Sequence, residues 1–275
     1  TLVVLDVRDP TSPSIVTEFA LPPASTSAYL DVAVHDGVAY VVNPFYGFCV
    51  VDVSDIHHPV LLSQYDLYNS YGLDCRDGLL AVTGNSFLSL YDVTTASEPL
   101  LLDTYSLPGG SFFVDLENDR AYVTGMSIGL VVLDVSDPAR IGLLGSYEFS
   151  AGIRDVVADG YTAYVAGYAG LEIVDLEDPD DPHVIGTYPC EDVSLKIHKH
   201  GDLVLLDDYH AGLKVIDVSD PTNPTLKGSV GAASMAVNSV AVVDRYALIP
   251  SSSDDALQII DLSGGPQACL LYTSD

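Results

Sequence analysis

Val-Val-Asp-Val-Ser-Asp, at residues 50–55, returns along the chain as Val-Val-Leu-Asp-Val-Ser-Asp-Pro at 131–138 and as Val-Ile-Asp-Val-Ser-Asp-Pro at 215–221. With looser copies there are seven, and the aspartate that closes each apolar run follows the previous one by 40 to 46 residues. These aspartates are Asp6, Asp52, Asp92, Asp134, Asp175, Asp217 and Asp261. A period of about 40–45 residues with four short strands per unit is the signature of a β-propeller.

One unit, residues 29–66, shows the expected strands. Apolar runs at 29–34, 38–42 and 48–53 are followed by a more polar run from residue 60, and we name these strands A, B, C and D. A His-Asp-Gly turn separates A from B, and a longer loop separates B from C. The same order follows in every later unit, and no segment has helical periodicity. The sequence therefore predicts an all-β propeller of four-stranded antiparallel blades without helices.

The Asp-x-Ser-Asp-Pro segment between strands C and D has a local explanation. The first aspartate can accept backbone N–H bonds in the turn, and an aspartate next to proline favours a type I turn. The alternative is calcium binding, which needs six or more oxygen ligands, usually from a dedicated loop. Because the same carboxylates recur in unit after unit, we favour the structural interpretation, under which Asp134 stabilises the fold without binding a metal.

Counting strands predicts how the repeats divide the chain. We expect one propeller domain over residues 1–275, with a half blade at 1–28 followed by six complete repeats over about 29–275. The half blade holds only a strand C (2–7) and a strand D (15–19). Two outer strands cannot pack without inner partners, so the sequence favours a truncated seven-bladed propeller over a six-bladed one with an N-terminal addition.

Composition narrows the possible partners. The 39 acidic and 10 basic residues give a net charge of −29, which disfavours nucleic acid and anionic membrane surfaces. No apolar run is long enough to predict membrane insertion. The acidity is explained equally by the turn chemistry of the repeats and by adaptation to salt or to a cation-rich extracellular setting. The four cysteines form no Cys-x-x-Cys pair, and a disulfide between any of them stays open.

The units at 129–138, 170–179 and 212–221, each beginning Gly-Leu and ending Asp-Pro, closely resemble the LVIVD-repeat family. Asp-Val-Ala-Val (31–34) followed by Ala-Tyr-Val (39–41) strengthens this resemblance. It covers almost the whole chain and implies a propeller of bacterial or archaeal secreted or surface-attached proteins. It carries over no catalytic residues. The copy at 89–94 departs in its following turn, and the last copy loses the turn motif.

The loops predict where a ligand would bind. In a propeller the D-to-A and B-to-C loops share one face, which we call the loop face, and here these loops vary in length and content. Variable loops on a rigid scaffold usually carry binding, and tyrosine suits protein or glycan surfaces. The candidate binding residues are Tyr29, Phe45, Tyr46, Tyr68, Tyr71, Phe112, Tyr168, Asp208, Tyr209 and His210. Tyr40, Tyr122 and Tyr164 of the B strands are expected to be packing residues instead.

Two further groups could hold a metal. Carboxylates recur near strand A, at Asp31, Asp74, Asp115, Asp155 and Asp192, and a ring of them could hold a divalent cation such as calcium. Hydrogen bonds to a neighbouring blade are the alternative explanation, which we favour. His198 and His200 should lie on the opposite side from Asp207, Asp208 and His210, so these five are not expected to converge.

Three functions stay open. The first is a non-enzymatic binding module of a secreted or cell-surface protein, part of a larger multidomain protein, whose loop face contacts a protein or a glycan. The second is a hydrolase or lyase that uses a cation on the strand A carboxylates. The third is an architectural spacer. No nucleophile elbow, phosphate-binding loop or dinucleotide motif favours an enzyme, and we expect no cofactor.

Overall fold

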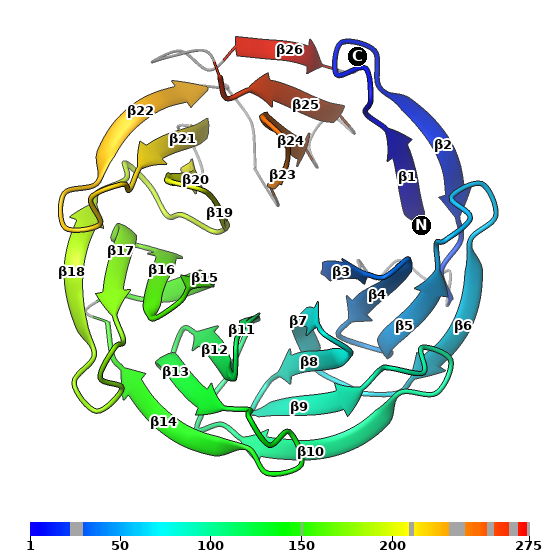
Figure 1. The fold of residues 1–275 in the computed structure, drawn as a ribbon, viewed down its shortest axis with the longest axis horizontal. Coiled ribbons are helices and arrows are strands. Elements are labelled where there is room, and N and C mark those ends of the chain that lie inside the picture. The colour runs from blue at the N-terminus through cyan, green and yellow to red at the C-terminus, as the bar shows by residue number, and fades with distance from the viewer. Residues whose placement is uncertain are drawn as a thin grey trace. The chain divides into compact units, whose positions relative to one another are not determined.

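The computed structural model of the chain describes residues 1–22, 30–149, 151–208, 212–230, 240–251, 256–263 and 269–273. Every regular element in these ranges is a β-strand, as the repeat predicts (Figure 1). The described residues contain no helix that could span a membrane. The chain divides into two compact units: unit 1 holds Thr1–Val7 and Pro13–Ser146, and unit 2 holds Arg8–Ser12 and Tyr147–Asp275.

Unit 1 contains one two-stranded sheet and three four-stranded sheets, all antiparallel. The two-stranded sheet pairs β1 (Leu2–Asp6) with β2 (Ser14–Phe19). The others are β3 (Asp31–His35), β4 (Val38–Asn43), β5 (Gly47–Asp52) and β6 (Val60–Tyr65); β7 (Ser70–Arg76), β8 (Leu79–Gly84), β9 (Phe87–Asp92) and β10 (Leu100–Ser106); and β11 (Phe113–Glu117), β12 (Arg120–Gly125), β13 (Gly129–Asp134) and β14 (Gly142–Tyr147).

Unit 2 contains three four-stranded sheets. They are β15 (Ile153–Asp159), β16 (Thr162–Gly167), β17 (Gly170–Asp175) and β18 (His183–Tyr188); β19 (Ile197–His200), β20 (Leu203–Asp208), β21 (Gly212–Asp217) and β22 (Thr225–Val230); and β23 (Ala241–Val243), β24 (Tyr246–Ser251), β25 (Ala256–Asp261) and β26 (Cys269–Thr273). In every four-stranded sheet the order along the sheet is the order along the chain, so each sheet is an A-B-C-D meander.

Strands B and C form the core because neighbouring sheets cover both of their faces. In unit 1, Tyr40 and Val42 of β4 pack against Leu73 and Cys75 of β7. The B-strand tyrosines Tyr40, Tyr122 and Tyr164 are all buried, which confirms that they are packing residues. Figure 1 shows β3, β7 and β11 side by side within unit 1, each at one end of its sheet.

The turn chemistry follows the prediction. In each four-stranded sheet, the aspartate that ends strand C accepts the backbone N–H of the residue two positions later, as Asp52 does from Ser54 and Asp134 from Ser136, both at 2.9 Å. The divergent turn after β9 keeps this contact, from Thr94 to Asp92, and so does the last copy, from Ser263 to Asp261. The local explanation of the repeated aspartates is therefore confirmed for these turns.

The pair β1–β2 has the features of a C–D pair from the repeat. The register shifts by one residue between Val4 and Leu5, as it does between Val50 and Val51 of β5 in the neighbouring sheet. Leu2 and Phe19 pack against Ala39, Val41 and other buried residues of the sheet β3–β6. Within the described residues, β1 pairs with β2 alone, whereas each other strand C lies between two strands.

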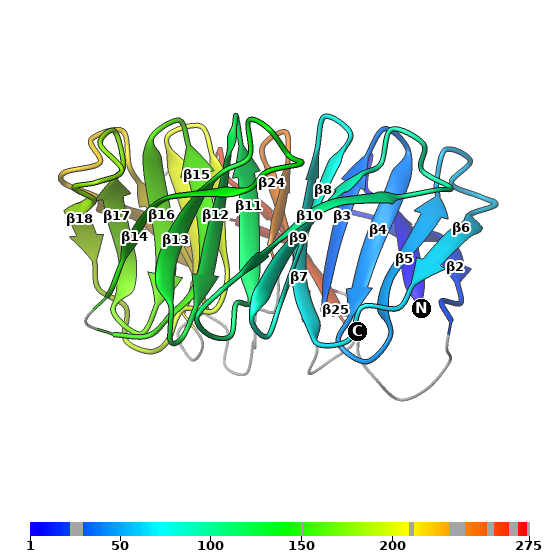
Figure 2. The same ribbon diagram turned by 90° about the horizontal axis from the view of Figure 1, so that it is seen from below.

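Figure 2 shows the strands of each unit running between two faces, where the connecting turns and loops lie. Because successive strands are antiparallel, the A-to-B and C-to-D turns lie on one face, and the B-to-C and D-to-A loops lie on the other. The turns of the first face are regular: Asp36 and Gly37, for example, form the tight A-to-B turn with φ values of 47° and 75°. The second face is the loop face, which carries the candidate binding residues.

Candidate functional site

The loop face of unit 1 exposes aromatic side chains. Phe45, in the B-to-C loop after β4, is 58% exposed, and Tyr68, in the D-to-A loop before β7, is 66% exposed. Met126, in the B-to-C loop after β12, is also exposed. Tyr71 and Phe112 are half-buried and their rings contact each other edge to face, with centroids 5.6 Å apart. Tyr46 is half-buried as well.

Backbone hydrogen bonds tie these loops to one another. The N–H of Asn69 donates to the carbonyl oxygen of Pro44 at 2.7 Å, and the N–H of Asn85 donates to the carbonyl oxygen of Asn69 at 3.0 Å. Asn69 has a φ of +63°, a left-handed conformation that asparagine tolerates better than most residues. Phe45 and Tyr68 are thus exposed on loops whose backbones are fixed.

In unit 2, Tyr168 is the exposed aromatic residue of the candidate list. The guanidinium of Arg154 lies 5.7 Å from its ring centroid and donates to its hydroxyl at 3.3 Å. This contact orients the Tyr168 ring, and half of the residue stays exposed to solvent. Three other candidates, Tyr29, Tyr209 and His210, lie outside the described residues.

Asp208 differs from the prediction. We expected an exposed group on the loop face, but the residue is fully buried. Its two carboxylate oxygens accept the backbone N–H groups of Glu191 and Asp192 at 3.0 and 3.1 Å, and the Lys214 ammonium lies 3.8 Å away. A carboxylate that close to the loop face becomes buried because the loop before β19 folds over it and supplies these donors.

The strand A carboxylates make hydrogen bonds between sheets. Asp31 accepts the N–H of its own neighbour Val32 and the N–H of Leu73 in the next sheet, at 3.0 and 3.2 Å. Asp74 does the same with Cys75 and Leu116, at 2.8 Å each. In unit 2, Asp155 accepts the backbone N–H groups of Val156 and Ile197 at 3.0 and 3.2 Å. These are the bonds to a neighbouring blade that we considered as the alternative to a cation ring.

These carboxylates do not occupy one recurring position. Asp31 and Asp155 stand opposite the fifth residue of strand B, Val42 and Ala166. Asp74 and Asp115 stand two residues further along strand A, opposite the third residue of strand B. Asp192 is outside strand A altogether, five residues before β19 begins, and its N–H is one of the donors to Asp208. The carboxylates that recur near strand A therefore occupy at least three different positions in the repeat.

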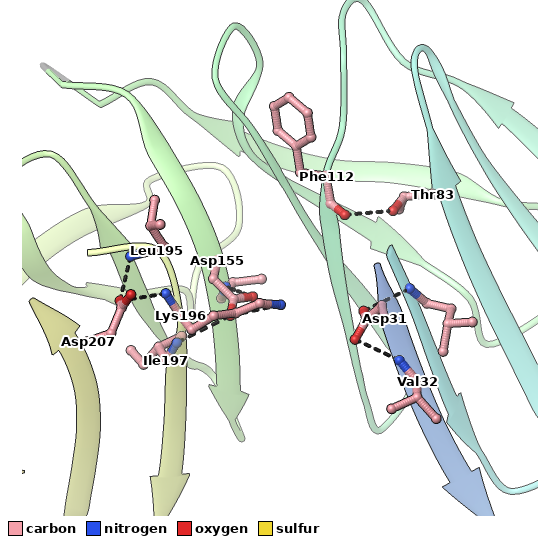
Figure 3. A network of polar contacts seen from close by, with 11 residues as sticks. Asp31, Val32, Thr83, Phe112, Asp155, Leu195, Lys196, Ile197 and Asp207 are labelled. Carbon is pink, nitrogen blue, oxygen red and sulfur yellow. Dashed lines mark hydrogen bonds and ion pairs between the residues drawn. The ribbon is translucent and has the colours of Figure 1, made fainter. Parts of the chain in front are cut away.

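Asp155 lies beside a lysine (Figure 3). The residue is almost completely buried, and the Lys196 ammonium lies 3.8 Å from its Oδ2. Burial raises the pKa of Asp155, and the nearby Lys196 and the two N–H donors oppose that rise. Burial also raises the pKa of Asp74 in unit 1.

Asp207, next to Asp208 at the end of β20, is fully buried as well. Its Oδ1 accepts the N–H groups of Leu195 and Lys196 at 2.5 and 2.7 Å (Figure 3). Its Oδ2 has no hydrogen-bond partner among the described residues. Burial and, to a smaller extent, the charge of Asp155 raise the pKa of Asp207 from 3.8 to about 7, although the two N–H donors and Lys196 act in the opposite direction. Asp207 therefore titrates near neutral pH.

The histidines lie at the other end of the same hairpin. His198 and His200 pair with Leu205 and Leu203, whereas Asp207 follows Leu206 at the far end of β20. Burial lowers the pKa of His198. The two histidines are therefore separated from Asp207 and Asp208, as the sequence predicts. In the described residues, no three His, Cys, Asp or Glu side chains are grouped so that they could hold a metal ion, and Cys49, Cys75 and Cys190 are free thiols.

Comparison with protein families shows to which family this chain belongs. The LVIVD repeat matches residues 1–20, 29–67, 114–148, 153–189 and 200–232, together more than half of the sequence. The chain belongs to the LVIVD repeat family. The sheet β7–β10, which contains the divergent turn after β9, is the one described sheet of unit 1 that lies almost wholly outside these matches. No curated protein sequence matches the chain.

Solved structures show the fold of this LVIVD protein. A protein from Lactobacillus plantarum superposes with a TM-score of 0.76 and 16% identity over 95% of this chain and 88% of its own. A functionally unknown protein from Desulfotomaculum acetoxidans gives 0.73 and 12% over 90% and 86%. The β-propeller domain of Cps50 (Swd1) from Myceliophteria thermophila gives 0.72 and 11% over 91% and 87%. At these identities the similarity establishes the fold, a β-propeller, and nothing about a ligand.

Sequence reasoning named Asp207 and Asp208 but missed that both are buried, and the LVIVD repeat contains the signal for this. At the same two places strand B ends in Thr83-Gly84, Thr124-Gly125 and Ala166-Gly167 in the three preceding sheets. Only the β19–β22 sheet puts two carboxylates there. A pair of buried acids in place of a small residue and a glycine breaks a local rule of the repeat, and such breaks tend to mark functional or strained places.

Proposed function

We propose that this LVIVD propeller is a non-enzymatic binding module, and that the loop face of unit 1 contacts a protein. The observation that carries the proposal is the exposure of Phe45 and Tyr68 on loops whose backbones are hydrogen-bonded to each other. Fixed loops lose little conformational entropy on binding, so the apolar area of the two rings is available to stabilise a complex.

The composition of this face favours a protein over a glycan. Exposed Met126 adds a flexible apolar side chain to the two aromatic rings, and methionine and aromatic residues are enriched in protein interfaces. The net charge of −29 favours a partner that is neutral or basic at the contact. We further propose, as the family resemblance implies, that the propeller works outside the cell or on its surface within a larger protein.

A display experiment tests the proposal. The chain would be screened against a peptide library and a glycan array, and each hit would be measured again with the double variant Phe45→Ser, Tyr68→Ser. Tyr161→Ser is the matched control, because Tyr161 is 57% exposed but lies in an A-to-B turn, at the strand ends opposite to the loop face. We expect peptide hits that weaken about tenfold or more in the double variant and are unchanged in the control. Hits confined to glycans would refute the protein assignment, and hits insensitive to both rings would refute the site.

A further inference from the structure

The loop between β18 and β19 lies across the end of β20 and is held there by its backbone N–H groups. We call its residues 190–196 the clasp. Four of its N–H groups donate to the carboxylates of Asp207 and Asp208. The N–H of Ser194 donates to the carbonyl oxygen of Gly167 at 3.0 Å. The clasp is thus fastened to two acids at the end of one strand and to the residue before Tyr168.

Asp207 shares its surroundings with a second buried acid, Asp155 of β15. Asp207 accepts the N–H groups of Leu195 and Lys196 (Figure 3). The next N–H along the chain, that of Ile197, donates to Asp155. The Lys196 ammonium lies 3.8 Å from Oδ2 of Asp155, and its positive charge also acts on Asp207. Two buried carboxylates therefore share one ammonium group.

Among the described residues, the other titratable groups near Asp207 supply no second cation for it. Lys214 of β21 lies 3.8 Å from Oδ2 of Asp208 and is beside an acid of its own. Burial raises the pKa of the Cys190 thiol to about 11, so this group of the clasp is neutral near pH 7. Oδ2 of Asp207 has no hydrogen-bond partner in the part of the chain that the structure describes. When ionised, Asp207 is thus a buried charge that lacks a cation of its own.

We propose that the clasp is a pH-dependent device on the loop face of unit 2, closed while Asp207 carries a proton and opened more often once Asp207 is ionised. Opening exposes Oδ2 of Asp207 to water, which removes the cost of a buried unpaired charge. Because the Ser194 N–H holds the Gly167 carbonyl oxygen, opening also releases the residue before Tyr168, which is half exposed on the loop face. The proposal goes beyond the binding function assigned to unit 1, since it concerns other loops and no ligand.

Linkage gives the direction and the pH range of this opening. In the closed clasp the pKa of Asp207 is about 7, and in the open clasp the exposed carboxyl returns to the ordinary value of 3.8. The closed form is therefore fully favoured below pH 4. As the pH rises to 7, the ratio of open to closed clasp increases by at most about tenfold per pH unit, and above pH 7 it levels off.

Hydrogen exchange of the intact chain between pH 5 and pH 8 tests the proposal. The protection factors of the Leu195 and Lys196 amides, which exclude the ordinary pH dependence of exchange, report how often the clasp opens. We expect them to fall about tenfold or more between pH 5 and pH 7 in the wild type, and to change by less than about twofold in Asp207→Asn. Asp217→Asn in the same sheet is the matched control, because the hydroxyl and N–H of Ser219 lower the pKa of Asp217. This control should follow the wild type.

Two further measurements separate the clasp from other openings. The labelling rate of the Cys190 thiol in the wild type, divided by its rate in Asp207→Asn at the same pH, should rise about tenfold between pH 5 and pH 7. Asp155→Asn removes the neighbouring negative charge without altering Asp207, so the fall in protection should end at a lower pH.

Three results would overturn the proposal. They are protection of the clasp that falls equally in the wild type and in Asp207→Asn, protection that stays level in both, and a profile that Asp155→Asn leaves unchanged. A simultaneous loss of protection throughout β16 would also overturn it, because the sheet and not the clasp would then be opening.

Discussion

Replacing Asp207 by asparagine should change how the stability of the protein depends on pH. The side chain is fully buried, its Oδ1 accepts two backbone N–H groups, and its Oδ2 has no partner among the described residues. Asparagine keeps the acceptor at Oδ1 and has almost the same shape. The substitution therefore removes the titration of this group with little change in packing.

The magnitude follows from the pKa. The pKa of Asp207 is raised from 3.8 to about 7 by burial and the charge of Asp155. Since one pKa unit corresponds to about 1.4 kcal/mol, the ionised folded form is disfavoured by about 4 kcal/mol at most. Solvent penetration and adjustment of the neighbouring Lys196 reduce this, so we expect about 1–3 kcal/mol.

The sign is fixed by linkage. A carboxyl with a raised pKa binds a proton more tightly in the folded state, so its stabilising contribution is complete below pH 4 and is lost as the pH rises through 7. Asp207→Asn has no such loss. The free energy of unfolding of the variant, measured relative to that of the wild type, should therefore rise by about 1–3 kcal/mol between pH 5 and pH 8.5.

Urea unfolding of both proteins at half-unit steps between pH 5 and 8.5 measures this difference. The control is Asp134→Asn, because the hydroxyl and N–H of Ser136 lower the pKa of Asp134. The contribution of Asp134 is present above the ordinary carboxyl pKa of 3.8 and lost as the pH falls through its folded value, so this variant should run parallel to the wild type above pH 5. If the difference between Asp207→Asn and the wild type is the same at pH 5 and pH 8.5, then Asp207 is ionised throughout and the argument from burial is wrong.

Three further outcomes are expected. Asp134→Ala should lower the free energy of unfolding at pH 7 by about 0.5–1 kcal/mol in urea unfolding, since the turn after β13 loses the acceptor for the Ser136 N–H. Millimolar calcium after chelation should leave the melting temperature unchanged by calorimetry, and a rise that depends on Asp31 or Asp155 would instead support the cation hypothesis. Gly125→Ala should cost more than about 2 kcal/mol, because its Cβ would lie 2.0 Å from the Gly110 carbonyl oxygen. At Gly160, where φ is +62° but no atom lies within 4 Å, Ala should cost only about 1 kcal/mol, so equal losses in the two variants would contradict the steric argument.

Local chemistry explains why most of the fold could be predicted. Strand D of the first complete repeat begins at Val60, where the sequence predicts it, because an apolar run follows the turn that ends in His58-Pro59. Strand B of the same repeat, predicted at 38–42, extends one residue further, to Asn43, since the ladder with strand C continues through a residue that lacks an apolar side chain. Contacts between sheets were harder to predict: whether Asp208 is exposed depends on a loop sixteen residues away in sequence.

The glycines at the end of strand B show why Asp208 requires a different loop. At Gly84, Gly125 and Gly167 an added Cβ would lie 2.5, 2.0 and 2.5 Å from the carbonyl oxygen of Asn69, Gly110 and Gly152, which belong to the D-to-A loops. A side chain at this position is therefore incompatible with the loop path of those sheets.

Asp208 occupies the same position in β20, and the preceding D-to-A loop presents the N–H groups of Glu191 and Asp192 to it in place of a carbonyl oxygen. The neighbouring Asp207 takes two more N–H groups, from Leu195 and Lys196, so the two acids together hold four donors of one loop. Where strand B ends in glycine, the loop places a carbonyl oxygen at this position, and where it ends in Asp208, the loop places N–H donors there. Asp208→Gly alone would leave the N–H groups of Glu191 and Asp192 without these acceptors, so it should loosen residues 190–196 without restoring the loop path of the other sheets. Faster amide exchange at Glu191 and Asp192, with unchanged exchange in β16, would show this; equal protection in variant and wild type would mean that other contacts hold the loop.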